Sequence, residues 1–192
     1  MKAFDTATDT TGHAHDIQEA GYGAVGIYLR FDRTSTAMVT GLHSVGVKVF
    51  SIYELGNPTS VSYFDELQGT HDGIAACNTA NKLGQPKQTP IFVAFDYDAN
   101  STDLTSALVP YMKAFRHSCQ RFGYLAGAYG SGLVLSYMQS SGLIHAGFLA
   151  QSKGWSNYDK YLPHAAIIQG ATSSVLGFDV DLCEVKDLTV LW

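Results

Sequence analysis

Eight short apolar runs, separated by segments of helical periodicity, constrain the fold of this 192-residue chain more than any other feature. They are nearly continuous in aliphatic and aromatic residues, which is typical of parallel strands buried on both faces. Strands that alternate with helices indicate an α/β fold, and eight is the number that closes a barrel. We therefore predict a compact, modified (β/α)8 TIM-like barrel in which residues 1–192 form one domain, with an open doubly wound sheet as the alternative. The eight runs are residues 3–5, 24–30, 47–54, 91–96, 125–129, 146–151, 165–169 and 177–181.

Four of the intervening segments show an apolar face and a glycine after their last turn, which predicts helices. Thr70 is the expected N-cap of one of them, and Gly123 follows the longest. Pro110 lies inside that longest segment and either kinks the helix or marks its start. A TIM barrel typically takes about 250 residues, so some helices must be short or missing, above all between residues 151 and 169. The four predicted helices cover residues 13–20, 35–45, 70–83 and 101–122.

Charge and cysteine content exclude several classes of protein. The chain has 17 acidic and 12 basic residues, a net charge of -5, whereas nucleic-acid-binding surfaces carry a basic excess. The longest apolar runs, such as residues 146–150, are too short to cross a bilayer. The three cysteines, Cys77, Cys119 and Cys183, form no C-x-x-C pair and are expected to be free, buried thiols.

Acidic residues stand at the ends of four of the predicted strands. The run 91–95 leads directly into Asp96 and Asp98, which would share one face of an extended strand with Cα atoms roughly 6.5–7 Å apart. Because the carboxyl ends of parallel strands meet at one end of a barrel, we expect these acids to converge on one cleft. The acids at the ends of the other three strands are Asp5, Glu54, Asp179 and Asp181.

A cluster of carboxylates separates the pKa values of its members and so supplies both an acid and a base near neutral pH. Glycoside hydrolysis needs that division of roles. Two other interpretations stay open. Each aspartate by itself could cap a helix or a turn, and the cluster as a whole could hold Mg²⁺ or Ca²⁺.

Aromatic residues close to the predicted strand ends are candidates for sugar binding, because aromatic faces pack against pyranose rings. Tyr28, Tyr53 and Tyr129 each stand at the end of a strand, and Trp155 lies in the loop after the sixth run. The sequence His13-x-His15-Asp16 has metal-ligand residue types but lacks a matching cluster elsewhere. We therefore predict no metal and no cofactor.

The stretch 89–129 resembles the glycoside-hydrolase-like domains of unknown function that are related to the family 25 lysozymes. The resemblance rests on Pro-Ile-Phe-Val-Ala-Phe-Asp-Tyr-Asp-Ala at 90–99 and Gly-Ala-Tyr-Gly at 127–130. Phe4-Asp5, the strand at 24–28, Gln169-Gly170 and residues 177–181 also fit, so the likeness spans nearly the whole chain. It implies a trimmed TIM barrel whose acidic groove takes a glycan, with Gln169 among the glycan-binding residues.

By motif position the resemblance implies a role for each acid. Asp96 matches the first acid of the lysozymes' Asp-x-Glu pair, and Asp98 stands where their glutamate acts as general acid. Asp5 and either Asp179 or Asp181 match the supporting acids. The aspartate at 98 is one methylene shorter than glutamate, a difference in reach of about 1.5 Å. Domains with Asp-x-Asp are therefore hydrolases of altered geometry, hydrolases of another glycan, or inactive binders.

From these observations we predict a lysozyme-like or muramidase-like glycosidase that cleaves peptidoglycan. Asp98 would protonate the leaving oxygen, and Asp96, helped by Asp5 or Asp181, would stabilise positive charge or position water. The spacing of the Asp96–Asp98 pair fits the roughly 6.5–9.5 Å separation that accommodates a water molecule. A catalytically inactive cell-wall carbohydrate-binding module is the alternative, and a metal-dependent hydrolase is a third possibility.

The first residues lack the apolar segment of a signal peptide, so we expect synthesis in the cytoplasm. Delivery to the cell wall or periplasm, as a phage lysin or a secreted antibacterial effector, would then bring the protein to its substrate. The expected partners are peptidoglycan or a related glycan, a delivery apparatus and an immunity protein, with no nucleic acid and no membrane span. We expect a monomer.

Overall fold

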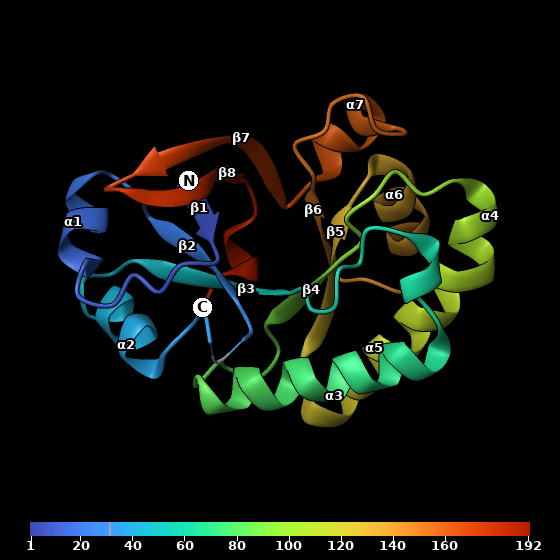
Figure 1. The fold of residues 1–192 in the computed structure, drawn as a ribbon, viewed down its shortest axis with the longest axis horizontal. Helices are drawn as coiled ribbons and strands as arrows, with labels where there is room; N and C mark the ends of the chain where they lie inside the picture. Colours follow the sequence, from blue (N-terminus) through green and yellow to red (C-terminus); the bar gives the residue numbers. More distant parts are fainter. Residues whose placement is uncertain (31) are drawn as a thin grey trace.

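In the computed structural model, which describes residues 1–30 and 32–192, eight strands close into a barrel in chain order (Figure 1). All eight predicted strands are confirmed, and barrel closure rules out the open sheet. The strands are β1 (Lys2–Thr6), β2 (Ala24–Tyr28), β3 (Lys48–Tyr53), β4 (Pro90–Ala94), β5 (Leu125–Gly130), β6 (Ala146–Leu149), β7 (Ile167–Val175) and β8 (Phe178–Val185).

The last strand runs in the opposite direction to the other seven, which corrects the prediction of an all-parallel barrel. β1 to β7 pair in parallel along the chain, whereas β8 is antiparallel to both β7 and β1. Only Leu176 and Gly177 join β7 to β8, with φ of 54° and 84°. Two residues with positive φ form a hairpin turn, and a parallel connection needs a dozen or more residues.

The reversal of β8 preserves the convergence of acids that the sequence predicts. Asp179 and Asp181 lie near the beginning of β8 rather than at its end. Because β8 is antiparallel, its beginning lies at the end of the barrel where the parallel strands finish, which we call the mouth. In β1, Asp5 is the Cα partner of Asp181.

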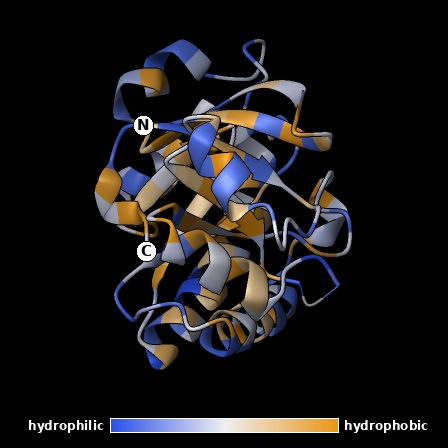
Figure 2. Ribbon diagram, turned by 90° about the vertical axis from the view of Figure 1, so that its left-hand side faces the viewer, coloured by the Kyte–Doolittle hydropathy of each residue, from blue (hydrophilic) through white to orange (hydrophobic). Residues whose placement is uncertain are grey.

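Alternating side chains divide the apolar residues into two layers. Phe50, Ile52, Phe92 and Phe148 form the core inside the barrel, while a larger set packs between the strands and the helices. Figure 2 shows orange, hydrophobic stretches in the central strands, whereas the helices around them carry both hydrophobic and hydrophilic colours. Glycines make room for the inner rings: a Cβ on Gly26 would lie 2.5 Å from the Phe50 ring.

The helices cover the outside of the barrel. They are α1 (Ala14–Glu19), α2 (Thr36–Ser44), α3 (Glu66–Lys82), α4 (Ser101–Asp103), α5 (Val109–Phe122), α6 (Gly132–Ser140) and α7 (Tyr158–Tyr161). Short 3-10 turns occupy Val61–Tyr63, Leu162–His164 and Leu188–Val190. The four-residue α7 confirms the prediction that a helix between residues 151 and 169 must be short or missing. Among the described helices, none combines the length and the apolar character that crossing a bilayer requires.

Helix ends agree with the sequence signals at most positions. Ser35 caps α2 by accepting from the Met38 amide, and Gly123 ends α5 in the left-handed region with φ 82°. Pro110 follows a π-helical turn, Leu104–Leu108, whose wider spacing accommodates a residue that lacks an amide hydrogen. The prediction for α3 is wrong at its start, because Asp65 is the N-cap and Thr70 lies inside the helix.

The three cysteines are free and buried, as predicted. Cys77 in α3 and Cys119 in α5 are in contact, with their Sγ atoms 3.8 Å apart. Cys183 lies inside the barrel, where its thiol donates to Asp5.

Candidate active site

A cavity of about 220 Å³ opens at the mouth of the barrel. Ile52 and Phe148, both from the barrel interior, are its apolar lining residues, and the other lining side chains are polar or aromatic. A concave site with an apolar floor and a few convergent polar groups is the usual form of a small-ligand pocket. The remaining residues that line it are Tyr28, Glu54, Asp96, Tyr129, Gln151, Gln169 and Asp181.

Glu54 follows β3 and lies on the same side of the chain as Phe50 and Ile52, because side chains alternate along a strand. The pKa of Glu54 is raised to about 7 from its ordinary value of 4.5, and burial is the largest cause. The neighbouring carboxylates of Asp96, Asp5 and Asp181 contribute to this rise, whereas Arg30 opposes it. The raised pKa keeps Glu54 protonated closer to neutral pH than an ordinary glutamate, as a proton donor requires.

Asp5 lies beneath the cavity and is only 1% exposed. Its carboxylate accepts from the Gln169 Nε2 at 3.1 Å, the Cys183 thiol at 3.3 Å and the Tyr28 hydroxyl at 3.3 Å. Burial raises the pKa of Asp5 to about 6, and Asp181 adds to this effect, while the hydrogen bonds partly offset it. The three donors fix the orientation of the carboxylate.

Asp96 and Asp181 complete the group of carboxylates. Asp96 is half-buried, and its backbone amide donates to the Pro58 carbonyl at 3.0 Å. Burial raises the pKa of Asp96, and the charge of Asp181 raises it further. Asp181 accepts from the Thr172 hydroxyl at 2.6 Å across the β7–β8 hairpin. Four acids from β1, β8 and the ends of β3 and β4 thus interact electrostatically at one end of the barrel.

Two tyrosines and a glutamine form the polar wall of the cavity. The Tyr129 hydroxyl donates to the Gln169 Oε1 at 2.8 Å, and the Gln169 amide nitrogen donates to Asp5. Burial raises the pKa values of Tyr28 and Tyr129 far above the ordinary value, and the neighbouring acids contribute. Both phenols therefore stay protonated, and while they donate to Gln169 and Asp5 their oxygens can accept from a ligand hydroxyl.

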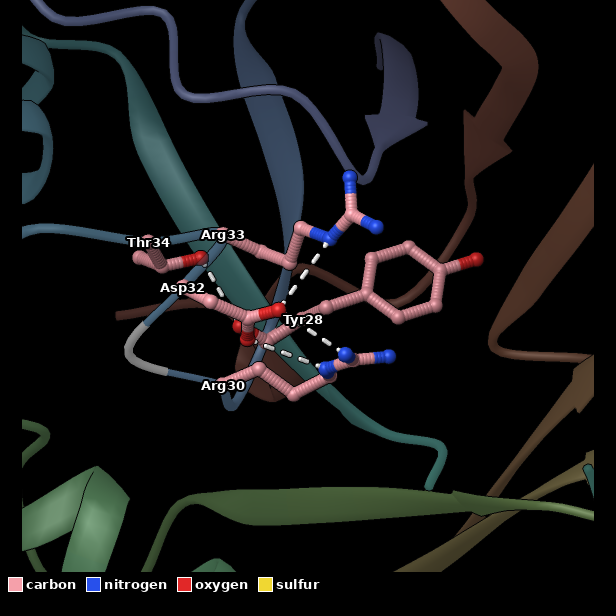
Figure 3. A network of polar contacts seen from close by, with 5 residues as sticks. All are labelled: Tyr28, Arg30, Asp32, Arg33 and Thr34. Atoms are coloured by element: carbon pink, nitrogen blue, oxygen red, sulfur yellow. Dashed lines mark hydrogen bonds and ion pairs between the residues drawn. The ribbon is translucent and has the colours of Figure 1, made fainter. Parts of the chain in front are cut away.

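A cationic side chain at the edge of the site was not predicted from the sequence. Arg30 lies two residues after Tyr28, and Figure 3 shows their side chains extending in the same direction. The Arg30 guanidinium donates twice to Asp32, at 3.1 and 2.9 Å, and the Arg33 Nε lies 3.5 Å from the same carboxylate (Figure 3). Its position two residues after Tyr28 could have identified Arg30, because side chains two residues apart in an extended chain lie on the same face. Sequence reasoning also missed Ile52, Phe148 and Gln151.

The structure separates Asp98 from Asp96, which corrects the expectation that the two carboxylates project together. β4 ends at Ala94, so the alternation of a strand does not continue to residue 98. Asp98 is exposed, does not line the cavity and accepts from the amide and hydroxyl of Ser156 at 2.8 and 3.1 Å.

Three other predicted site residues also lie outside the cavity. Tyr53 points to the opposite side of β3 from its neighbour Glu54, and its hydroxyl donates to Asp72 at 3.1 Å. Trp155 is half-buried in the β6–α7 loop and does not line the cavity. Asp179 is exposed and lines a smaller hollow next to the mouth, which Asp5, Tyr28 and Asp181 also line.

Within the described residues, no three His, Cys, Asp or Glu side chains are arranged to hold a metal ion. His13, which the sequence places in a metal-like motif, forms an exposed pair with Asp16 at 3.1 Å.

Carboxylates gathered at the mouth of an eight-stranded barrel are the arrangement expected of a glycoside hydrolase-like domain. The chain belongs to the family described as Rv2525c-like, glycoside hydrolase-like domain, which matches residues 15–188. This confirms the resemblance that the sequence motifs indicate.

A protein of Bacillus subtilis is similar to most of this chain. The uncharacterized protein YbfG of Bacillus subtilis (strain 168) is 34% identical in an alignment 173 positions long that covers 80% of this chain. That match spans 24% of YbfG, so this chain corresponds to about a quarter of its relative.

Two solved structures share the fold. The Tat-secreted protein Rv2525c of Mycobacterium tuberculosis, in complex with L-tartrate, aligns with a TM-score of 0.78 at 20% identity, covering 100% of this chain and 98% of Rv2525c. The modular autolysin LytC of Streptococcus pneumoniae, in complex with a synthetic peptidoglycan ligand, aligns with a TM-score of 0.58 at 16% identity. That alignment covers 95% of this chain and 46% of LytC.

Proposed function

We propose that this domain hydrolyses glycosidic bonds of peptidoglycan, with Glu54 as the proton donor. The observation that carries the proposal is that Glu54 shares a cavity with Asp96 and Asp181 and has a pKa of about 7. Near neutral pH, protonated Glu54 would give its proton to the leaving glycosidic oxygen. Asp96 and Asp181 are the carboxylates available to stabilise the positive charge of the oxocarbenium-like transition state or to orient the attacking water.

The rest of the cavity suits a sugar ring. Ile52 and Phe148 offer an apolar surface for the C–H face of a pyranose. The hydroxyls of Tyr28 and Tyr129 and the side chain of Gln151 offer hydrogen bonds to sugar hydroxyls. Gln169, which Tyr129 and Asp5 hold in place, is the fourth polar contact that we assign to the glycan.

The choice of peptidoglycan rests on the relatives. LytC, which shares the fold, is an autolysin solved with a peptidoglycan ligand, and Rv2525c is a secreted protein. We infer by analogy that this domain acts outside the cytoplasm, at the cell wall. The delivery apparatus and the immunity protein stay predictions.

The proton-donor role is assigned to Glu54 rather than to Asp98 because only Glu54 lines the cavity. The hydrogen bonds of Asp98 to Ser156 engage both of its carboxylate oxygens in the folded structure. The role of Asp98 as general acid, which the family motif implies, stays a prediction that substitution can test.

The test is digestion of purified peptidoglycan, with new reducing ends detected by mass spectrometry. We expect wild type to release fragments and Glu54→Gln to lower kcat by at least about 100-fold, the usual minimum contribution of a general acid. Glu19→Gln is the matched control, because Glu19 is exposed at the end of α1. Full activity of Glu54→Gln would contradict the assignment. If wild type pellets with the wall but releases nothing, the domain is a carbohydrate-binding module instead.

A further inference from the structure

A buried carboxylate that takes no part in the cavity lies between α3 and the barrel. Asp72 is 2% exposed and receives four hydrogen bonds. Three come from the hydroxyls of Tyr53 at 3.1 Å, Tyr63 at 2.7 Å and Tyr111 at 2.6 Å, and the fourth comes from the Gln68 amide at 2.9 Å. The donors belong to β3, the Val61–Tyr63 turn, α5 and α3, so one side chain connects four elements.

Burying a carboxylate is costly unless donors compensate for the lost water. An apolar side chain would fill the same space without that cost, but it could not hold three phenols in fixed positions. The arrangement is therefore better suited to orienting its neighbours than to adding stability. Of the three phenols, Tyr63 belongs to the segment that joins β3 to α3.

That segment, residues 54–65, includes one acid of the cavity, Glu54, and accepts a hydrogen bond from the backbone of another, Asp96. It begins with Glu54. Two residues later Gly56 lies against the Tyr63 ring, where a Cβ would come within 2.8 Å of a ring carbon. Further along, the Pro58 carbonyl accepts from the amide of Asp96 at 3.0 Å. The position of Tyr63 therefore bears on both Glu54 and Asp96.

We propose that Asp72 is a positioning residue which, by holding Tyr63, fixes the β3–α3 loop and so orients Glu54 and Asp96 in the cavity. The catalytic consequence rests on the proposed function, but the orientation itself does not. Loss of the Tyr63 hydroxyl should loosen the loop, expose Glu54 to water and reduce the burial that keeps its carboxyl protonated.

The chain offers a matched pair of variants for the test. Tyr63→Phe and Tyr111→Phe each delete one phenol hydroxyl that donates to the same oxygen of Asp72, Oδ2. Tyr111→Phe cuts the hydroxyl link to α5 but keeps the ring that packs against Tyr63 and Phe64 of the loop, so it reports the cost of losing one hydrogen bond to Asp72. The titration of Glu54, followed by NMR of the ¹³C-labelled carboxyl and assigned by its absence in Glu54→Gln, needs no enzymatic activity.

We expect the Glu54 pKa to stay at about 7 in Tyr111→Phe and to fall toward 4.5 in Tyr63→Phe and Asp72→Asn. None of the charged residues that set this pKa, Asp96, Asp5, Asp181 and Arg30, is substituted in any of the three variants. If hydrolysis is detected, the alkaline limb of its pH profile should move in the same direction. An unchanged titration in Tyr63→Phe, or an equal change in Tyr111→Phe, would overturn the proposal. A wild type without hydrolytic activity would overturn only the proposed function.

Discussion

Asp5 in β1 and Asp181 in β8 are Cα partners across the antiparallel seam that closes the barrel. Side chains of such partners lie on the same face of the sheet, here the one that faces the barrel interior, close to the mouth. The two carboxylates repel, and Asp181 raises the pKa of Asp5 and also those of Glu54 and Asp96. The seam therefore contributes to the electrostatics of the whole cavity.

Asp181→Asn is expected to lower the pKa values of Asp5 and Glu54, because a negative charge that opposes their ionisation is removed. The asparagine oxygen can still accept from Thr172, so the β7–β8 hairpin should remain intact. Carboxyl titrations by NMR would show both curves displaced to lower pH. Asp179→Asn, at an exposed position two residues earlier, is the control and should leave both curves in place. Equal displacement by the two variants would contradict a specific effect of the seam.

Folding stability should decrease as the pH rises through the range 4.5 to 7. The pKa of Glu54 is raised to about 7 from 4.5 in the folded protein, so the folded state binds this proton more tightly than the unfolded state does. Its contribution is complete below pH 4.5 and is lost as the pH rises through 7. Asp5, with a pKa of about 6 against 3.8, acts in the same direction.

Glu54→Gln tests this linkage, because it removes the buried charge that forms at high pH. At pH 8 we expect the variant to be more stable than wild type by roughly 1–3 kcal/mol, a rise in Tm of about 3–8 °C. At pH 4 this advantage should vanish. Calorimetry at both pH values measures it, with Glu19→Gln as the control; an advantage that does not depend on pH would argue against a raised pKa.

Gly26→Ala should destabilise the barrel from inside. A Cβ at this position would lie 2.5 Å from the Phe50 ring and 2.6 Å from the Asp5 Cβ, closer than packed atoms approach. Overpacking of a rigid core costs about 1–3 kcal/mol, measurable as a lower denaturant midpoint. Gly154→Ala is the matched control, since a Cβ there has no neighbour within 4 Å. Equal denaturant midpoints for the two variants would show that Phe50 and Asp5 can move enough to accommodate the added methyl group.

The sequence predicted those features that depend on local pattern. Apolar runs marked all eight strands, and acids at the strand ends marked the mouth, because burial and alternation are properties of neighbouring residues. Two errors could have been avoided from the same signals. Asp65 followed by Gln68 is a capping-box pattern, and Tyr53 and Glu54, as neighbours in a strand, could not both face the cavity.

Other features depend on contacts between distant residues and could not be predicted. The direction of β8 follows from a two-residue turn, but only closure against β1 shows that a reversed strand fits the barrel. Similarly, the Asp96 amide bonds to Pro58 instead of continuing the ladder of β4, and Asp98, beyond the end of that strand, accepts from Ser156.

Asp98 should prove to hold a loop rather than to donate a proton. Its two oxygens accept from the amide and hydroxyl of Ser156, which lies next to Trp155 in the β6–α7 loop. Asp98→Ala removes both acceptors, so we expect faster amide hydrogen exchange in residues 152–157. If the loop contacts the glycan, KM should rise about fivefold, which corresponds to the roughly 1 kcal/mol of one lost hydrogen bond, with kcat nearly unchanged.

Asp98→Asn separates the two roles of this residue. The asparagine oxygen can still accept from the Ser156 amide, so the loop should keep its slow exchange and its KM. An amide cannot donate a proton as a carboxylic acid does, so a general acid at this position would lose kcat as severely in Asp98→Asn as in Asp98→Ala. Wild-type kcat in Asp98→Asn, together with a large loss in Glu54→Gln, would assign acid catalysis to the end of β3. The reverse result would return that role to Asp98 and require the β6–α7 loop to release its carboxylate when substrate binds.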